Sequence, residues 1–317
     1  MKKALIIGIS GQDGSLLADY LINNKNYEVY GTTRNIKATN FENLRKLNIY
    51  EKIKILETNL DNIDQVISIL IKVNPSEIYN LSGQTSVAKS FEIPLLTYND
   101  ITTTYILLEA IRVYDLKIKF FNAGSTDCFG EAAYPANEET KFNPISPYGV
   151  SKSSSFNIVK NYREVYGVYA CSGILSNHES IFRKNHFITT KIIDAIFNIA
   201  NRNQKYLEIG NINIYRDWGW ANEYVEAIYL LMQQENKPKD YIIATGQTIS
   251  LEEFISIAFS IYNLDYAKYI KIDNNLIRKQ DISKTFLDVS KINSEIKWVA
   301  KMKVKDVILR LSKNKII

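Results

Sequence analysis

The first half of the chain alternates short apolar runs with segments whose apolar residues recur at helical spacing. Residues 4–7 form the first apolar run, and residues 15–24 carry the first helical pattern. Strands that alternate with helices in this way build a parallel sheet with helices on both faces. We therefore predict a doubly wound α/β fold, with further strands at 28–32, 53–58, 77–81, 118–123 and 169–175, and helices at 62–72, 97–113 and 147–166.

A glycine-rich segment, GISGQDG, lies between the first predicted strand and the first predicted helix. Glycines at this spacing make a tight turn and let the backbone approach a pyrophosphate at the N-terminus of the helix. An ordinary strand-to-helix turn is the alternative, but the flanking elements make the match more specific than its spacing alone. We predict that the segment binds a nicotinamide dinucleotide through Gly8, Gly11, Gln12, Asp13 and Gly14.

The end of the second predicted strand bears on the choice of dinucleotide. Proteins that prefer NAD usually place an acidic residue there to bind the ribose 2′-hydroxyl. In this chain Thr32 and Thr33 are followed by Arg34, whose guanidinium can pair with a 2′-phosphate. NADP is therefore favoured and NAD is the alternative. The competing interpretation makes Arg34 a solvated surface charge.

Beyond residue 176 the pattern changes. Helical patterns at 187–203, 222–233, 251–262 and 304–311 are separated by loops with few strand signals. No Pro-, Gly- or Ser-rich linker divides the chain, so the two halves are expected to interleave. We predict a dinucleotide-binding domain over residues 1–176 and a smaller, mostly helical substrate domain over residues 177–317.

Composition and charge exclude several classes of protein. The 317 residues are 46% hydrophobic and carry a net charge of +5, without the basic, aromatic-interleaved run of a nucleic-acid-binding protein. No apolar stretch approaches the roughly 18 residues of a membrane helix, and the first one is too short for a signal peptide, so we expect a cytoplasmic protein. Cys128 and Cys171 are too few for a disulfide framework and lack metal-ligand spacing, so no metal is expected.

Two tyrosines are followed four residues later by a lysine, in the pairs Tyr50/Lys54 and Tyr148/Lys152. With 21 tyrosines in the chain, such pairs arise by chance. Only the second pair follows a Ser-Pro helix start, which places both side chains one turn apart on the same helical face. A Lys ammonium and an oxidised nicotinamide both favour a Tyr phenolate. Tyr148 can then take a hydroxyl proton as hydride leaves the same carbon.

A polar run, Ser-Thr-Asp, follows the predicted strand at 118–123. This is the carboxyl edge of the sheet, where open α/β folds bind their ligands. Ser125 is placed to hydrogen-bond a reacting hydroxyl and Asp127 to move a proton. The alternative is that these residues only form a turn or a helix cap.

Longer motifs give the chain a resemblance to a known family. They are GISGQDGSL at 8–16, YNLSGQTSV at 79–87, SPYGVSK at 146–152, GILSNHES at 173–180, LEIGNINIYRDW at 207–218 and ATG at 244–246. On these motifs the chain resembles the GDP-mannose 4,6-dehydratase family of extended short-chain dehydrogenases/reductases, over nearly its whole length. The resemblance implies a Rossmann fold, a bound nicotinamide cofactor and a GDP-sugar substrate.

The resemblance also implies roles for individual residues. Ser125 stands where the family usually has Thr and Asp127 where it has Glu, whereas Tyr148 and Lys152 match. Further cofactor-binding residues implied are Asn59, Leu60, Leu81, Ser82, Gly83 and Arg183, the last near a subunit interface of a homodimer or homotetramer. Substrate-binding residues implied are Ser86, Asn177, Lys191, Arg216, Arg278 and Asp281. His178 is interpreted as a residue that holds a loop.

For a dehydratase the implied reaction is oxidation at C4 of the sugar, loss of water across C5 and C6, and reduction at C6. The candidate substrates are GDP-mannose, a GDP-manno-heptose and GDP-N-acetylglucosamine, and the product is a 4-keto-6-deoxy sugar. Asp127 is one methylene shorter than Glu, which favours the alternative of a GDP-sugar 4-dehydrogenase or epimerase that retains water. A catalytically silent protein that senses the cofactor is the third hypothesis, against which the set Ser125, Tyr148 and Lys152 argues.

Overall fold

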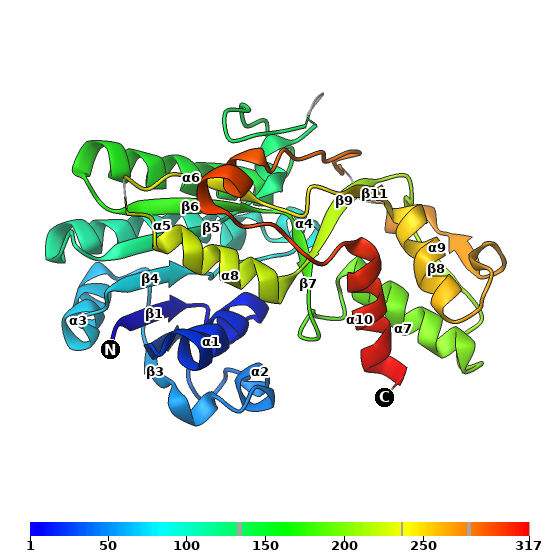
Figure 1. Cartoon of the computed structure of the whole chain (residues 1–317), viewed down its shortest axis with the longest axis horizontal. Helices are drawn as coiled ribbons and strands as arrows, with labels where there is room; N and C mark the ends of the chain where they lie inside the picture. Colours follow the sequence, from blue (N-terminus) through cyan, green and yellow to red (C-terminus); the bar gives the residue numbers. More distant parts are fainter. Residues whose placement is uncertain (132–134, 236, 278–279, 317) are drawn as a thin grey trace.

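The computed structural model describes residues 1–131, 135–235, 237–277 and 280–316. At its centre is a seven-stranded sheet whose neighbouring strands all pair in parallel, in the order β10-β6-β5-β4-β1-β2-β3 (Figure 1). The strand order reverses direction between β1 and β4, where folds of this kind bind dinucleotides. The strands are β1 (Lys3–Ile7), β2 (Glu28–Thr33), β3 (Lys54–Glu57), β4 (Glu77–Asn80), β5 (Lys119–Ser125), β6 (Ala170–Leu175) and β10 (Tyr241–Ile243).

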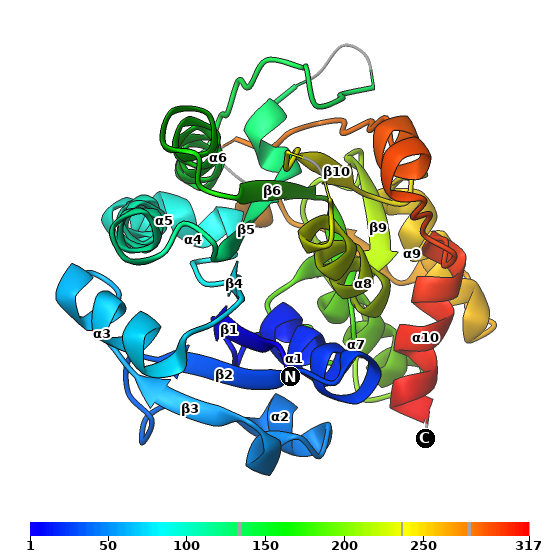
Figure 2. The same ribbon diagram turned by 60° about the vertical axis from the view of Figure 1, so that its left-hand side comes forward.

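Helices cover both faces of this sheet, as Figure 2 shows. On one face, α1 (Gln12–Lys25) packs against α8 (Ala221–Met232), and both contribute to one apolar core. On the other face, α3 (Ile63–Val73), α5 (Pro94–Tyr114) and α6 (Pro147–Tyr166) share a second core. The predicted doubly wound α/β fold is therefore confirmed.

The predicted elements of the first half are present with small differences at their ends. The helix predicted at 97–113, for example, is α5 and begins three residues earlier. Two short helices were not predicted, α2 (Glu42–Lys46) and α4 (Val87–Glu92). Helices of five and six residues complete too few turns for a periodic pattern to be seen.

The second half builds a smaller lobe, on the right in Figure 1. Its helices α7 (Ile188–Ala200), α9 (Leu251–Ile261) and α10 (Val304–Ile316) share an apolar core with buried side chains such as Ile196 and Phe254. Two small sheets were not predicted. They consist of β7 (Asn177–Glu179), β9 (Tyr215–Trp220) and β11 (Thr248–Ser250), and of β8 (Leu207–Ile209) and β12 (Ile270–Ile272). Four of their five strands have only three residues, too few to show an alternation of apolar and polar positions, and only β9 is longer, with six.

The chain crosses between the two parts more than once. Residue 176 lies between β6 and β7, but β10 returns to pair with β6, and α8 returns to pack on α1. A buried ion pair joins α6 to the start of β10: Arg163 Nη2 lies 2.7 Å from Asp240 Oδ2. Within the described ranges, no helix combines the length and apolar character needed to cross a membrane.

Candidate active site

The glycine loop connects β1 to α1 at the point where the strand order reverses. Gly8 has a φ of 86°, a left-handed conformation that favours glycine. A Cβ on Gly14 would lie 2.3 Å from the carbonyl oxygen of Gly8. The start of α1, at Gly11, receives no side-chain cap from the described residues, so no side chain competes with an anion for its first-turn N–H groups. These features fit the pyrophosphate of a dinucleotide.

We expect Gly14→Ala to weaken NADP⁺ binding about tenfold, or about 1.4 kcal/mol, because the new methyl group displaces the turn that approaches the pyrophosphate. Titration calorimetry measures the Kd. Gly167→Ala is the matched control, since Gly167 also has a positive φ but its added Cβ meets nothing within 4 Å. An unchanged Kd for Gly14→Ala would contradict the assignment of this loop to the pyrophosphate.

Three predicted cofactor residues lie beside the glycine loop, just after β4. The Leu81 N–H donates to the carbonyl of Ile7 at 3.0 Å, which continues the β1–β4 pairing. Ser82 Oγ donates to Asn80 Oδ1 at 2.7 Å. Gly83 has a φ of 126°. These residues therefore lie beside the loop, at the same edge of the sheet.

The remaining cofactor residues of the first domain lie farther along the same sheet edge. Arg34 directly follows β2 and is exposed, and Asn59 and Leu60 follow β3, the first exposed and the second half-buried. Carboxyl ends of parallel strands lie at one edge, so these positions line up with the glycine loop. Burial raises the pKa of the Asp100 carboxyl of α5, and the Arg34 charge is among the weaker effects that lower it.

Ser125 and Asp127 contact each other at the end of β5. Ser125 Oγ donates to Asp127 Oδ2 at 3.1 Å, and the Asp127 N–H donates back to Ser125 Oγ at 3.2 Å. The serine therefore also caps the short 3-10 turn Thr126–Phe129, which is the alternative role considered for it. Ser125, which is predicted to bind a reacting hydroxyl, and Asp127, which is predicted to move a proton, are therefore within hydrogen-bond distance of each other.

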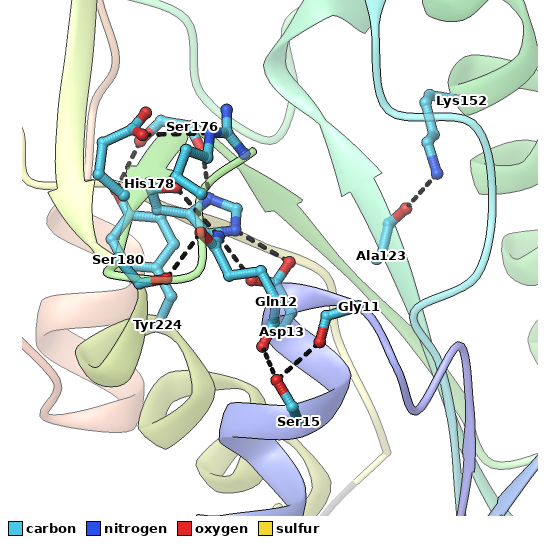
Figure 3. A network of polar contacts seen from close by, with 12 residues as sticks. Gly11, Gln12, Asp13, Ser15, Ala123, Lys152, Ser176, His178, Ser180 and Tyr224 are labelled. Atoms are coloured by element: carbon cyan, nitrogen blue, oxygen red, sulfur yellow. Dashed lines mark hydrogen bonds and ion pairs between the residues drawn. The ribbon is translucent and has the colours of Figure 1, made fainter. Parts of the chain in front are cut away.

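Tyr148 and Lys152 lie in the first turns of α6, next to the end of β5. Ser146 Oγ accepts from the Gly149 N–H at 3.0 Å, so the N-cap inferred from the sequence is present. Lys152 is buried, and its Nζ donates to the carbonyl of Ala123 at 3.2 Å (Figure 3). The same Nζ lies 5.8 Å from the centroid of the Tyr148 ring. The helix thus brings the ammonium and the phenol to one edge of β5.

The Tyr148 hydroxyl is shielded by the protein and faces a negative charge. Burial raises the pKa of Tyr148 well above its usual value near 10, and the Asp127 carboxylate raises it further. The hydrogen bond with Ser125 acts in the opposite direction but is outweighed. With the protein groups alone, Tyr148 is therefore a phenol at neutral pH.

Asp100 on α5 lies near the Lys152 ammonium, and the sequence does not single it out. Its Oδ2 accepts from the Gln84 N–H at 3.2 Å, and burial raises the pKa of its carboxyl while the Lys152 ammonium lowers it. The Asp100 charge in turn raises the pKa of Tyr148. Its signal in the sequence is its helical spacing from the buried residues Thr97 and Thr104.

A cavity of about 750 Å³ lies in the smaller lobe, beside α7 and β8. Two predicted substrate residues, Lys191 and Asp281, are part of its wall, and Arg216 Nη2 lies 2.8 Å from Asp281 Oδ1. The wall also contains apolar side chains, among them Leu207 and Ile209. The cavity wall therefore combines cationic, acidic and apolar groups, and a third predicted substrate residue, Arg216, pairs with the acidic one.

Residues 5–311 match the family model described as GDP-mannose 4,6 dehydratase. The chain belongs to this family. A relative named GDP-mannose 4,6 dehydratase 1, from Arabidopsis thaliana, is 39% identical over 314 residues, which cover 95% of this chain and 86% of the relative. The family resemblance inferred from the motifs is confirmed, and with it the prediction of a nucleotide-sugar-modifying enzyme.

Solved structures share the fold of this dehydratase family member. A UDP-glucose 4-epimerase from Thermotoga maritima, solved with UDP-glucose, superposes with a TM-score of 0.86 at 22% identity and covers 99% of this chain and 98% of its own. A dTDP-glucose 4,6-dehydratase from Bacillus anthracis in complex with NAD gives a TM-score of 0.85 at 18% identity, with the same coverage. Because one fold serves both an epimerase and a dehydratase, the residues of the site must distinguish the reactions.

Three other predicted residues, Asn177, Ser86 and Arg183, are not among the described residues that line the cavity. Asn177 begins β7 opposite Trp218 of β9, and Ser86 Oγ caps α4 by accepting from Lys89 N–H at 3.3 Å. Arg183 Nε lies 3.1 Å from Glu179 Oε2, and its guanidinium lies 3.5 Å from the centroid of the Phe187 ring. Arg278 lies outside the described residues.

Proposed function

We propose that this protein is a GDP-mannose 4,6-dehydratase in which Ser125, Asp127, Tyr148 and Lys152 carry the chemistry. The observation that carries the proposal is the contact of the Ser125, Asp127 and Tyr148 side chains at the end of β5, on the same sheet edge as the glycine loop. The family membership supports the same reaction. GDP-manno-heptose and GDP-N-acetylglucosamine are the other substrates to be tested.

In the proposed reaction Tyr148 takes the proton of the sugar 4-hydroxyl, which Ser125 holds by a hydrogen bond. A nicotinamide cofactor held by the glycine loop would supply the hydride acceptor for C4 and the hydride donor for C6, and the positive charge of its oxidised form would favour the Tyr148 phenolate. The C4 ketone acidifies the proton on C5, which Asp127 removes. Asp127 then donates that proton to the departing C6 hydroxyl, which leaves as water. As hydride returns to C6, C5 regains a proton that balances the one Tyr148 took from the 4-hydroxyl, and the product is the 4-keto-6-deoxy sugar.

The cofactor is proposed to be NADP, because the exposed Arg34 follows β2 where an NAD-binding protein carries an acid. We expect Arg34→Ala to weaken NADP⁺ binding about tenfold and to leave NAD⁺ binding unchanged, since only NADP has the 2′-phosphate. Fluorescence titration with both dinucleotides measures this. Lys37→Ala, which removes an exposed cation from the same loop, is the control. Equal losses for both dinucleotides would favour NAD.

The GDP moiety is proposed to occupy the cavity beside α7, with Lys191 and Arg216 binding the diphosphate. Asn177, Ser86, Asp281 and Arg278 are proposed to complete the substrate site. Arg216 is paired with Asp281 in this structure, so binding of a diphosphate would exchange one anionic partner for another. We further propose a cytoplasmic homo-oligomer in which Arg183 lies near a subunit interface, and a substrate domain that begins at residue 177.

The second candidate function is a GDP-sugar 4-dehydrogenase or epimerase. It is favoured by the short Asp127 side chain, whose Oδ2 accepts a hydrogen bond from Ser125 Oγ at 3.1 Å. The two candidates are separated by incubating the purified protein with the three GDP-sugars and, as a control, UDP-glucose. A product lighter by one water supports the dehydratase, whereas lasting cofactor reduction without loss of mass supports the dehydrogenase. An isomer of unchanged mass supports the epimerase, and turnover of no GDP-sugar overturns both candidates.

A further inference from the structure

Both ring nitrogens of His178, on β7, face oxygen atoms (Figure 3). Nδ1 lies 2.7 Å from the carbonyl oxygen of Ser176, and Nε2 lies 3.0 Å from Oδ2 of Asp13. A carbonyl or carboxylate oxygen only accepts hydrogen bonds, whereas a neutral imidazole carries a single N–H. Only the doubly protonated ring therefore satisfies both contacts.

The charges around His178 agree with this protonation state. Burial lowers the pKa of His178, but the charge of Asp13 and its hydrogen bond outweigh burial and raise the pKa above the usual 6.5. Arg183, in the loop after β7, opposes the protonated form, and Tyr224 of α8 stacks on the ring with 4.7 Å between centroids. Burial acts to raise the pKa of the Asp13 carboxyl, but the charge and the hydrogen bond of His178 outweigh burial and lower this pKa to about 2.

The same segment binds the first turn of α1 at two further points. Gln12 Nε2 donates to the carbonyl of His178 at 3.2 Å, and Ser180 Oγ donates to Gln12 Oε1 at 2.8 Å. Gln12 and Asp13 are the first two residues of α1 and belong to the glycine-rich segment 8–14. Chain segments about 165 residues apart are thus held together at the start of the helix.

We propose that His178 is a positioning residue for the cofactor: as an imidazolium ion it fastens the first turn of α1 to β7 and fixes the N–H groups that receive the pyrophosphate. This inference deepens the proposed function and rests on its assignment of the glycine loop to a dinucleotide. The chain that leaves β7 continues into α7, which borders the cavity.

The expected pH dependence follows from the direction of the two shifts. The pKa of His178 is higher in the folded than in the unfolded chain, so its contribution is complete below about pH 6.5 and is lost as the pH rises through the raised pKa. Asp13 stays ionised down to about pH 2 and does not limit the ion pair in this window. The protein should therefore bind the cofactor more weakly as His178 loses its proton.

The protonation of His178 can be measured in the wild-type chain, which contains two histidines. In a histidine-labelled sample, NMR titration should show one ring with a pKa above 6.5 and one below it. Burial and then Lys89 lower the pKa of the other ring, His186. His186→Gln identifies its resonance. Two values at or below 6.5 would overturn the proposal without the need for any variant at residue 178.

Binding of NADP⁺ and NAD⁺ is then compared among His178→Gln, Asp13→Asn and wild type. We expect both variants to bind each dinucleotide about tenfold more weakly below pH 6.5, and the wild type to approach them as the pH rises. Asp19→Asn is the control, because it removes the same charge from α1 at a residue that contacts Asn23 instead. Wild-type affinity and pH dependence in His178→Gln would overturn the proposal.

These measurements are independent of sugar turnover. If no GDP-sugar is converted but the variants lose cofactor affinity as expected, the proposed reaction fails and the role of His178 stands. If GDP-mannose is dehydrated normally and neither variant changes cofactor affinity, the reaction stands and the role of His178 fails.

Discussion

Tyr148→Phe should lower kcat for GDP-mannose about a thousandfold, because general-base catalysis by a positioned side chain contributes about a hundredfold to ten-thousandfold. The substitution removes only the hydroxyl. It leaves the ring in place, 5.8 Å from Lys152 Nζ. Steady-state rates with GDP-mannose, together with the KM, measure the effect. NADP⁺ binding shows whether the cofactor site is intact.

The chain supplies a matched control for this substitution. Tyr50→Phe alters the other Tyr-x-x-x-Lys pair, in which Tyr50 begins a 3-10 turn and Lys54 begins β3. Its rate should equal that of the wild type. A Tyr148→Phe enzyme with more than a tenth of the wild-type kcat would remove Tyr148 from the role of base.

The sheet and its covering helices could be predicted because most strands of the first half, such as β4 and β6, are buried apolar runs, and the long helices carry apolar residues at helical spacing. The prediction fails where elements are short. β10 has three residues and joins the large sheet next to β6, although about 65 residues separate them in sequence, and neither its length nor its neighbours indicate that pairing. Tertiary packing, rather than local pattern, determines such strands.

The same distinction holds in the site. The contact between Ser125 and Asp127 is local, and the Ser-Pro start of α6 marks Tyr148 and Lys152, so the sequence indicates all four residues. The ion pair of Asp13 with His178 is not predictable in this way, because its partners come from α1 and β7. The sequence marks His178 only as a residue that holds a loop, and the structure shows which helix it contacts.

The protonation states of the site also depend on the fold. From the sequence, Lys152 is expected to lower the pKa of Tyr148. In the structure, burial and the Asp127 charge dominate and raise that pKa, while Lys152 Nζ donates to the carbonyl of Ala123. Activation of Tyr148 therefore depends on the charge of the bound oxidised cofactor more than the sequence indicates.

Asp127→Asn should slow the loss of water about a hundredfold to a thousandfold while oxidation at C4 continues, because an amide cannot accept the C5 proton. The variant should also oxidise the sugar at lower pH than the wild type, since the Asp127 charge raises the pKa of Tyr148 and its removal lowers that pKa. Product mass and the absorbance of the reduced nicotinamide, followed over the neutral and alkaline range, measure both effects.

Asp127→Glu changes the same side chain in the opposite direction. The added methylene extends the carboxylate by roughly an ångström, and a misplacement of that size costs about a hundredfold in rate. If the reach of Asp127 limits elimination, the Glu variant should lose water faster than the wild type. A dehydrogenase behaves differently: apart from the shift of oxidation to lower pH, the Asn variant turns over like the wild type, and the Glu variant gains nothing, because no proton leaves C5. The two substitutions together therefore decide whether the carboxylate bound to Ser125 is a catalytic base or only part of the turn that follows β5.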